Sequence, residues 1–206
     1  MDNLIIKDPI LHLFICELDK FREYLKQGIP KNINRKEICV YMNMKEVEFG
    51  NKILKQYCER KLCYSKKKYT KQWTSQVCEC IVKEILIQTG ETPKKPKKIK
   101  DPDTGLNLQP DIETENAIYE VKSRCVTVPG TAGEKVLGTP FKYCNVPRLY
   151  KKRLNIVLVG YQEEEYKDFF DISKISEERR KIIEQWNSIN IYFMFASKML
   201  KCSTSF

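Results

Sequence analysis

Hydrophobic residues recur at helical spacing near the start of the chain. Between Pro9 and Lys26 the apolar positions follow one another at intervals of three or four residues, at Leu11, Phe14, Leu18, Phe21 and Leu25. Proline suits the first turn of a helix, and Gly28 and Pro30 follow the last apolar position. We expect one amphipathic helix over 9–26, with its stripe against the core or against a second subunit. A second helix is expected over 45–60.

The segment 74–88 has a similarly clear helical pattern. Val77, Ile81 and Ile85 lie on one stripe, and Gly90 follows as a stop signal. We therefore expect a helix here that packs against the core.

Two apolar runs near the C-terminus are typical of strands. Residues 154–160, LNIVLVG, form a nearly continuous run that predicts a buried central strand, and 191–196 predict a final buried strand. Between them, Ser176 is expected to cap a helix, because acidic residues fill its first turn. The apolar side of that helix carries Ile182, Ile183 and Trp186.

These elements predict an α/β fold in a single domain, with a mixed central sheet flanked by helices. A chain of 206 residues can bury a sufficient core without disulfides. We divide it into a helical, basic N-terminal region over 1–72, which packs on or embraces the rest, and a core over 73–206.

The stretch 105–124 contains two short runs that predict a β-hairpin. If the turn is centred on residues 115–116, antiparallel pairing places Asp111 directly opposite Glu120, and opposite residues share a face. The two-residue period of a strand puts Lys122 on that face as well. The expected face carries Ile118, Glu120 and Lys122, and the opposite face carries Tyr119 and Val121.

Two carboxylates and a lysine on one face can support phosphodiester hydrolysis. Mg²⁺ prefers oxygen ligands, and one or two carboxylates suffice because it keeps several waters. The lysine could orient or activate the attacking water and offset charge on the phosphate. The alternative is an acid–lysine pair on a solvated hairpin face, which is common on exposed strands.

The charge of the chain favours a polyanionic partner. Lysine and arginine number 37 against 27 aspartates and glutamates, for a formal net charge of +10. Nucleic acid and an anionic membrane both fit this surplus. The sequence has no apolar run long enough to span a membrane and no signal-peptide pattern, so we expect a cytoplasmic protein.

The nine cysteines and the single histidine argue against other chemistries. The cysteine count is odd and the spacing irregular, so we expect reduced thiols and no structural zinc. His12 is expected on the N-terminal helix. A Ser-His-Asp or Cys-His hydrolase is disfavoured, because His12 would have to be its only base.

Two basic segments are candidates for nucleic-acid contact. Lys66, Lys67 and Lys68 are interleaved with tyrosines, a combination that suits phosphate contact and base stacking. Residues 92–100, TPKKPKKIK, are expected to be extended and to lead into a turn at 101–105. Both segments could equally be solvated surface.

A third stretch, 129–143, contains three glycines that permit close backbone approach to a ligand, and its alternative is a plain surface loop. It lacks the ending of a phosphate-binding P-loop. The contact candidates in and after it are Thr131, Lys135, Lys142, Arg148, Lys151 and Lys152.

Pro110-Asp111, followed after eight residues by Glu120-Val121-Lys122, resembles the signature of the PD-(D/E)xK superfamily of nucleases, of which type II restriction endonucleases are typical. The resemblance implies that Asp111 and Glu120 hold Mg²⁺ and that Lys122 lies near the attacking water. It also implies a further glutamate on the preceding helix, for which Glu79 is preferred over Glu84.

The same resemblance implies a restriction-endonuclease-like core over 73–206, in which the stretch after the catalytic strand lies against the DNA backbone. The expected activity is sequence-specific cleavage of double-stranded DNA. A homodimer would match the two-fold symmetry of such a site, and a protecting DNA methyltransferase would be its genetic partner. A repair or junction-resolving nuclease, and a non-catalytic nucleic-acid-binding protein, remain as alternatives.

Overall fold

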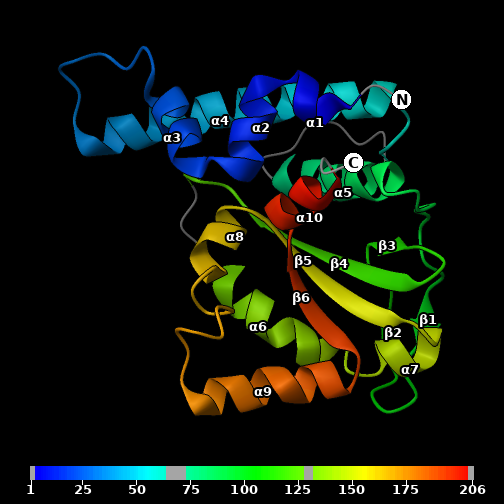
Figure 1. The fold of residues 1–206 in the computed structure, drawn as a ribbon. Helices are drawn as coiled ribbons and strands as arrows, with labels where there is room; N and C mark the ends of the chain where they lie inside the picture. The colour runs from blue at the N-terminus through cyan, green and yellow to red at the C-terminus, as the bar shows by residue number, and fades with distance from the viewer. Residues whose placement is uncertain (1–2, 64–72, 128–131, 204–206) are drawn as a thin grey trace.

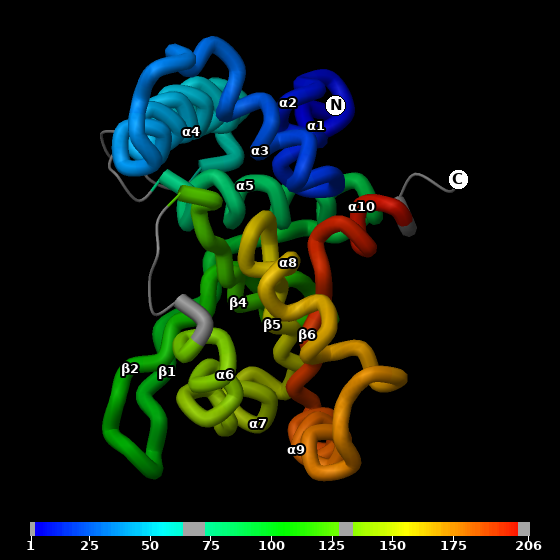
Figure 2. The backbone as a smooth tube through the Cα atoms, turned by 90° about the vertical axis from the view of Figure 1, so that its left-hand side faces the viewer, coloured from blue at the N-terminus to red at the C-terminus, as the bar shows by residue number. Residues whose placement is uncertain are grey.

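The computed structural model describes residues 3–63, 73–127 and 132–203. Its centre is a four-stranded sheet with the order β3-β4-β5-β6 (Figure 1). Helices cover both faces, and Figure 2 shows the same division in a view turned by 90°. The expected α/β fold, with a mixed sheet flanked by helices, is confirmed.

The sheet combines one antiparallel and two parallel neighbours. Strands β3 (Ile112–Glu113) and β4 (Ala117–Arg124) form the antiparallel hairpin. Strand β5 (Arg153–Gly160) runs parallel to β4, and β6 (Ile191–Phe195) runs parallel to β5. The expected central strand is confirmed, because β5 is buried at every residue except Arg153. Strand β6 was expected to be buried but is only half-buried, because it lies at the edge of the sheet.

The N-terminal region folds into α1 (Leu4–Lys7), α2 (Pro9–Cys16), α3 (Leu18–Lys26) and α4 (Arg35–Glu59). The expectation of one helix over 9–26 is wrong, because Glu17 leaves the helical conformation at φ −141° and ψ 61°. The rings of Phe14 and Phe21 lie 5.3 Å apart. A continuous helix would separate these positions by roughly 10 Å along its axis. The break therefore brings the two rings together.

Helix α4 begins ten residues before the expected start at residue 45. Asn34 accepts hydrogen bonds from the Lys36 and Glu37 amides, and Glu37 accepts one from the Asn34 amide. This capping box satisfies backbone donors that would otherwise lack partners at the helix start.

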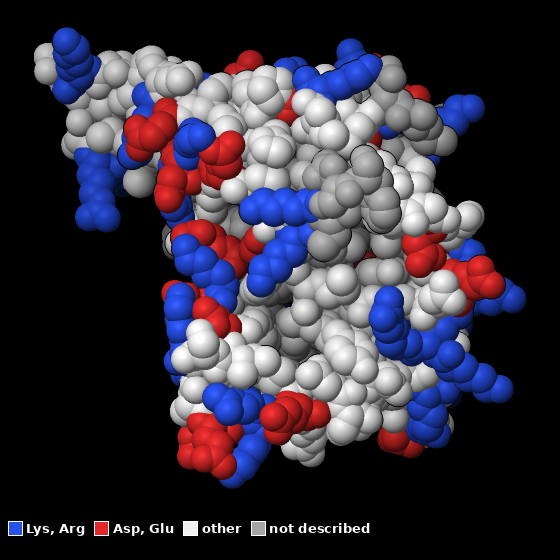
Figure 3. Space-filling model, in the orientation of Figure 1, with Lys and Arg blue, Asp and Glu red and all other residues white. Residues whose placement is uncertain are grey.

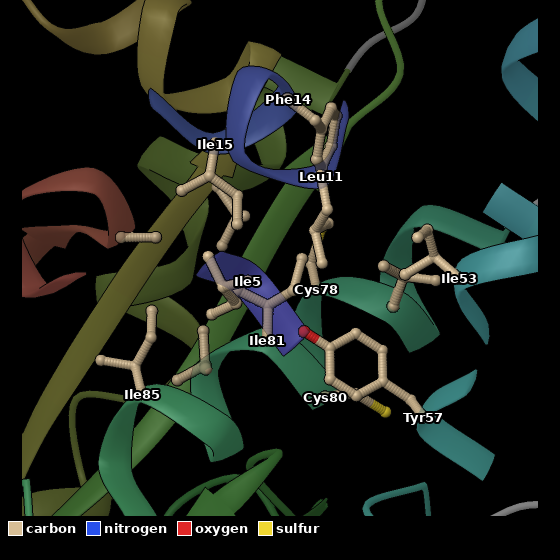
Figure 4. Packing of buried hydrophobic residues seen from close by; sticks show 14 of the residues in the cluster. Ile5, Leu11, Phe14, Ile15, Ile53, Tyr57, Cys78, Cys80, Ile81 and Ile85 are labelled. Carbon is tan, nitrogen blue, oxygen red and sulfur yellow. The ribbon is translucent and has the colours of Figure 1, made fainter. Parts of the chain in front are cut away.

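Helix α5 (Trp73–Gln88) lies between the sheet and the N-terminal helices, within one residue of the expected start. Its predicted stripe is buried in a cluster shared with α1, α2 and α4, which Figure 4 shows from close by. Gly50 allows α4 to lie directly against Trp73 of α5, since a Cβ at this position would lie 2.0 Å from the Trp73 ring. The N-terminal region and α5 thus share one hydrophobic core.

The segment before the hairpin is extended, as expected. Strands β1 (Ile99–Lys100) and β2 (Asn107–Leu108) form a small antiparallel sheet on either side of the expected turn. Upstream, Lys94 pairs with Glu113 in an antiparallel bridge, with hydrogen bonds of 2.8 and 2.9 Å. This bridge attaches the lysine-rich segment to the open side of β3.

The opposite face of the sheet is covered by α6 (Ala132–Lys142), α7 (Val146–Tyr150) and α9 (Glu177–Ser188). The expectation of a loop over 129–143 is wrong for the part that forms α6. Burial of Val136 and Tyr143 against the sheet outweighs the poor helix propensity of the glycines and of Pro140.

Helix α9 has the expected Ser176 cap, but its apolar side is more open than expected, with Ile182 47% exposed. Two short helices were not expected: α8 (Tyr161–Tyr166) follows β5, and α10 (Ala196–Ser203) follows β6. Among the described residues, no helix combines the length and apolar character that crossing a bilayer requires.

One expectation about the cysteines is wrong. Cys63 and Cys80 form a disulfide, which joins the segment after α4 to α5. The irregular cysteine spacing concealed this pair, because Cys63 and Cys80 are 17 residues apart and meet only when the segment after α4 packs against α5. His12 lies on an N-terminal helix as expected.

Candidate active site

The hairpin has the register that the sequence predicted. Ile112 pairs with Tyr119 and Glu113 with Ile118, which centres the turn between residues 115 and 116. The register changes before Ile112, because the Asp111 amide donates to the carbonyl of Tyr119, the residue paired with Ile112, at 3.1 Å. Asp111 therefore lies at the start of β3, beside the part of β4 that carries Glu120.

The Asp111 side chain is fixed by the neighbouring strand. Its Oδ2 accepts a hydrogen bond of 2.7 Å from the Val121 amide. Pro110 is buried directly before it, so the carboxylate starts from a rigid backbone. This arrangement holds Asp111 against β4 between the two other motif residues, Glu120 and Lys122.

Alternation along β4 gives each motif residue its surroundings. Ile118 belongs to the cluster beneath α6 and α7, whereas Tyr119 belongs to the cluster beneath α5. Glu120 shares the face of Ile118, as expected, and is only 6% exposed. The alternative of an acid–lysine pair on a solvated face is therefore wrong.

Lys122 and Glu120 form a direct ion pair. Lys122 Nζ donates to Glu120 Oε1 at 2.7 Å. The second carboxylate oxygen, Oε2, is buried and accepts no hydrogen bond from the described residues. A buried carboxylate oxygen without a donor is costly, so this atom is a candidate ligand for a cation.

The two candidate glutamates of α5 have different surroundings. Glu84 accepts the Leu4 amide at 2.7 Å and pairs with Arg60 at 2.7 Å, which anchors the N-terminal helices. Glu79 instead lies within electrostatic reach of Asp111 and Glu120, because both charges raise its pKa. Of the two, Glu79 is therefore the one beside the hairpin carboxylates.

The pKa values of all three carboxyl groups are raised, mainly by burial. Burial, followed by the charge of Asp111, raises the pKa of Glu120 to about 7 and that of Glu79 to about 7. Burial also raises the pKa of Asp111, against the lowering effects of the Val121 amide and nearby lysines. Buried acids with raised pKa values that lie near one another are characteristic of functional sites.

Lys83 was not predicted and lies beside these acids. Its side chain on α5 is 2% exposed. Burial lowers its pKa to about 8, although the charges of Glu79 and Asp111 act to raise it. Lys83 follows Glu79 by four residues, one helical turn, within an otherwise apolar segment, and this spacing was the available signal.

Tyr143 was also not predicted. It lies just after α6, is buried, and has its hydroxyl beside the Glu120 carboxylate. Burial raises the pKa of Tyr143, and the charges of Glu120 and Asp111 raise it further. Lys142 Nζ donates to the Tyr143 hydroxyl at 3.1 Å and lies 4.6 Å from the centre of its ring. Lys142 also lowers the pKa of both carboxyl groups, so its charge reaches the site.

The donor set fits a hard divalent cation with few protein ligands. Within the described residues, no group of three or more histidine, cysteine, aspartate and glutamate side chains is close enough to hold a metal. Asp111 and Glu120 supply carboxylate oxygens, and Glu120 Oε2 lacks a donor. Mg²⁺ commonly uses one or two carboxylates and completes its shell with water and substrate phosphate.

The predicted DNA-contact residues have varied surroundings. Lys66, Lys67, Lys68 and Thr131 lie outside the described residues. Lys135 and Lys151 are exposed, and exposed Arg148 pairs with Asp103 at 3.7 Å. Lys152 pairs with Glu113 and donates to the Thr114 carbonyl, both at 2.7 Å, so it supports the hairpin instead. On the face in Figure 3, basic and acidic side chains are mixed.

The lysine-rich segment lines a cavity near the hairpin. This cavity of about 380 Å³ is bordered by Lys94, Lys95 and Lys97, together with Glu113 and Tyr150. Lys95 lowers the pKa of Glu79, so its charge reaches the acidic cluster. Three lysines line the cavity against one glutamate, so it can attract an anionic group to this side of the hairpin.

Glu46 of α4 connects the N-terminal region to the site. It is fully buried and accepts the amides of Val126 and Thr127 at 2.7 and 3.1 Å, just after β4. The Thr127 hydroxyl also donates to it. These hydrogen bonds hold the segment that directly follows β4, the strand that carries Glu120 and Lys122.

Comparison with known proteins gives no further guide to this site. No protein family, curated protein or solved structure matches the chain. The functional conclusion therefore depends on the residues themselves.

Proposed function

We propose that this protein is a metal-dependent endonuclease that hydrolyses phosphodiester bonds in double-stranded DNA, in the manner of type II restriction enzymes. The observation that carries the proposal is the cluster of Asp111, Glu120 and Glu79, whose pKa values are all raised, with Lys122 bonded to Glu120. A cation and a phosphate would complete the charge balance of this cluster.

The residues have separate roles in the proposed reaction. Asp111 and Glu120 would hold Mg²⁺, which supplies electrostatic stabilisation of the phosphate and lowers the pKa of bound water. Lys122, held by Glu120 Oε1, orients or deprotonates the attacking water. Glu79 supports the cation site from α5, and Lys142 and Lys95 attract the DNA backbone.

The order of elements is compatible with the resemblance to the restriction-endonuclease core. Helix α5 precedes the hairpin β3–β4, and the buried strand β5 follows, which is the order expected for 73–160. Helix α6, between the hairpin and β5, was not part of that expectation. Cleavage of both strands at a symmetric sequence would use a homodimer, and a DNA methyltransferase would protect the host's own sites inside the cell.

The proposal is tested by incubating the purified protein with large unmethylated DNA in Mg²⁺ or in EDTA. Discrete fragments that require Mg²⁺ are the expected result. Branched and mismatched DNA are tested in parallel, and faster cleavage of these would replace the restriction-type substrate with a structural one. If every DNA stays intact in Mg²⁺, the nuclease proposal is wrong.

A further inference from the structure

The cavity beside β3 is bounded by a segment whose backbone is held at several points. The antiparallel bridge between Lys94 and β3, with hydrogen bonds of 2.8 and 2.9 Å, attaches the lysine-rich segment to the sheet. Gln109 Nε2 donates to the Pro96 carbonyl at 3.0 Å, and the Tyr150 hydroxyl donates to the Lys97 carbonyl. The cavity of about 380 Å³ is therefore formed by the fold itself and does not depend on the position of a single long side chain.

The lysines that line this cavity outnumber its acids. Among the described residues of the lining, Glu113 carries the negative charge, and it already pairs with Lys152 at 2.7 Å and with Lys94 at 3.6 Å. Lys95 and Lys97 are exposed and form no ion pair with any residue that the structure describes. Their two positive charges are therefore available to an anionic ligand.

The remainder of the lining is apolar and suits the sugar of a nucleotide. Ile99, Leu149 and the ring of Tyr150 form this part, and all three are half-buried. A volume of about 380 Å³ falls within the range of roughly 300–1,000 Å³ that is typical of ligand sites. Ammonium groups beside an apolar wall match a sugar–phosphate unit, because the phosphate takes the charge and the sugar carbons contact the wall.

The cavity lies on the same face of the sheet as Glu120. Glu113 pairs with Ile118, and paired residues share a face. Glu120 is the next residue of β4 on that face, about 7 Å farther along the strand. Leu149 and Tyr150 pack against the hydrophobic cluster of the same face. A phosphate in the cavity and a phosphate at the proposed metal site would therefore lie along one hairpin.

We propose that this cavity binds a non-scissile phosphate of the substrate DNA through Lys95 and Lys97. The inference rests on the proposed nuclease function and deepens it, because it adds a second phosphate contact at a defined place. Contacts to phosphates position a protein on DNA without reading its sequence. Two such contacts along the hairpin determine the direction in which the DNA strand crosses Glu120.

The first test measures the salt dependence of DNA binding, with a fluorescein-labelled duplex in EDTA so that no cleavage occurs. Lys95→Ala/Lys97→Ala should lower the slope of log affinity against log salt by about 1, because one phosphate contact is lost. Lys98→Ala/Lys100→Ala is the matched control, since both lysines are exposed in the same segment but do not line the cavity. This control should keep a slope close to that of the wild type. Equal slopes for the two double variants would overturn the inference.

The second test separates a DNA phosphate from a small phosphorylated ligand. Inorganic phosphate is titrated at constant ionic strength, and thermal unfolding of the wild type and of Lys95→Ala/Lys97→Ala is followed. Phosphate should raise the Tm of the wild type alone. If it does so while the two double variants bind DNA with equal slopes, the cavity belongs to a small phosphorylated molecule and its role with DNA is wrong.

Failure of this inference and failure of the nuclease proposal give different results. Cleavage in Mg²⁺ with equal slopes for the two double variants contradicts the phosphate site and leaves the nuclease proposal intact. A reduced slope for Lys95→Ala/Lys97→Ala alone, without cleavage of any DNA in Mg²⁺, supports the phosphate site and contradicts the nuclease proposal.

Discussion

Lys122 Nζ lies 2.7 Å from Glu120 Oε1, and the other oxygen of this buried carboxylate accepts no hydrogen bond from the described residues. Lys122 therefore forms a hydrogen bond with only one of the two oxygens of the Glu120 carboxylate. Burial raises the pKa of Glu120, and the negative charge of Asp111 raises it further. In the proposed function, a cation bound at these two carboxylates would offset their negative charge, and the predictions on Mg²⁺ below test this.

The stability of the metal-free protein should decrease as pH rises from 5 to 8. Glu120 and Glu79 have folded pKa values of about 7, above the ordinary value of 4.5. The folded state therefore holds more protons than the unfolded state in this range, and it loses that advantage as pH rises through 7. We expect a decrease on the order of 2 kcal/mol in the free energy of unfolding, measured by denaturant titration in EDTA.

The matched variant for this pH dependence is Glu120→Gln, which cannot titrate. It should flatten the decrease, whereas Glu59→Gln, at an exposed position on α4, should leave it unchanged. Stability that rises between pH 5 and 7 in the wild type would contradict the raised pKa values.

Removal of Lys83 should make the protein more dependent on Mg²⁺. Lys83→Met leaves Glu79 and Asp111 without a buried positive charge that acts on both. At pH 7, where Lys83 of the wild type is mostly charged, we expect Mg²⁺ to raise the free energy of unfolding of Lys83→Met by about 1 kcal/mol more than that of the wild type, as measured by thermal unfolding. Lys152→Met is the control, since it breaks the ion pair with Glu113. Equal stabilisation of both variants by Mg²⁺ would show that Lys83 has no connection to a cation site.

Tyr143 should position Glu120 without being essential to the fold. Tyr143→Phe removes only the hydroxyl beside Glu120, so the free energy of unfolding should change by about 1 kcal/mol or less. Single-turnover DNA cleavage should slow about tenfold, and the Mg²⁺ concentration for half-maximal rate should rise. Tyr166→Phe, buried in the same cluster, should show neither effect. Wild-type rates for Tyr143→Phe at all Mg²⁺ concentrations would exclude this role.

The hairpin was predictable because its register is a local property. A turn centred on residues 115–116 determines the pairing of Ile112 with Tyr119, which brings Asp111 beside the part of β4 that carries Glu120, and alternation then places Lys122. The start of α4 could also have been predicted, since the Asn34 and Glu37 capping box is local.

The residues that were missed depend on tertiary packing. Lys83 lies 28 residues before Asp111, and Tyr143 lies 23 residues after Glu120. Nothing in their immediate sequence indicates which face of the sheet each approaches. The same reason explains α6, where burial of Val136 outweighs two glycines and a proline. The positions of helices and strands could therefore be predicted better than the residues, such as Lys83 and Tyr143, that surround the motif carboxylates.

The central claim is that Asp111 and Lys122 perform phosphodiester hydrolysis. The most direct measurement is the single-turnover cleavage rate of duplex DNA in Mg²⁺ for Asp111→Asn and Lys122→Met, after circular dichroism shows that both are folded. Asp168→Asn and Lys181→Met make the same substitutions at exposed positions outside the proposed site and are the controls. We expect the two site variants to lose at least about a thousandfold in rate, and the controls to stay within a few-fold of wild type. Wild-type cleavage by folded Asp111→Asn would contradict the account.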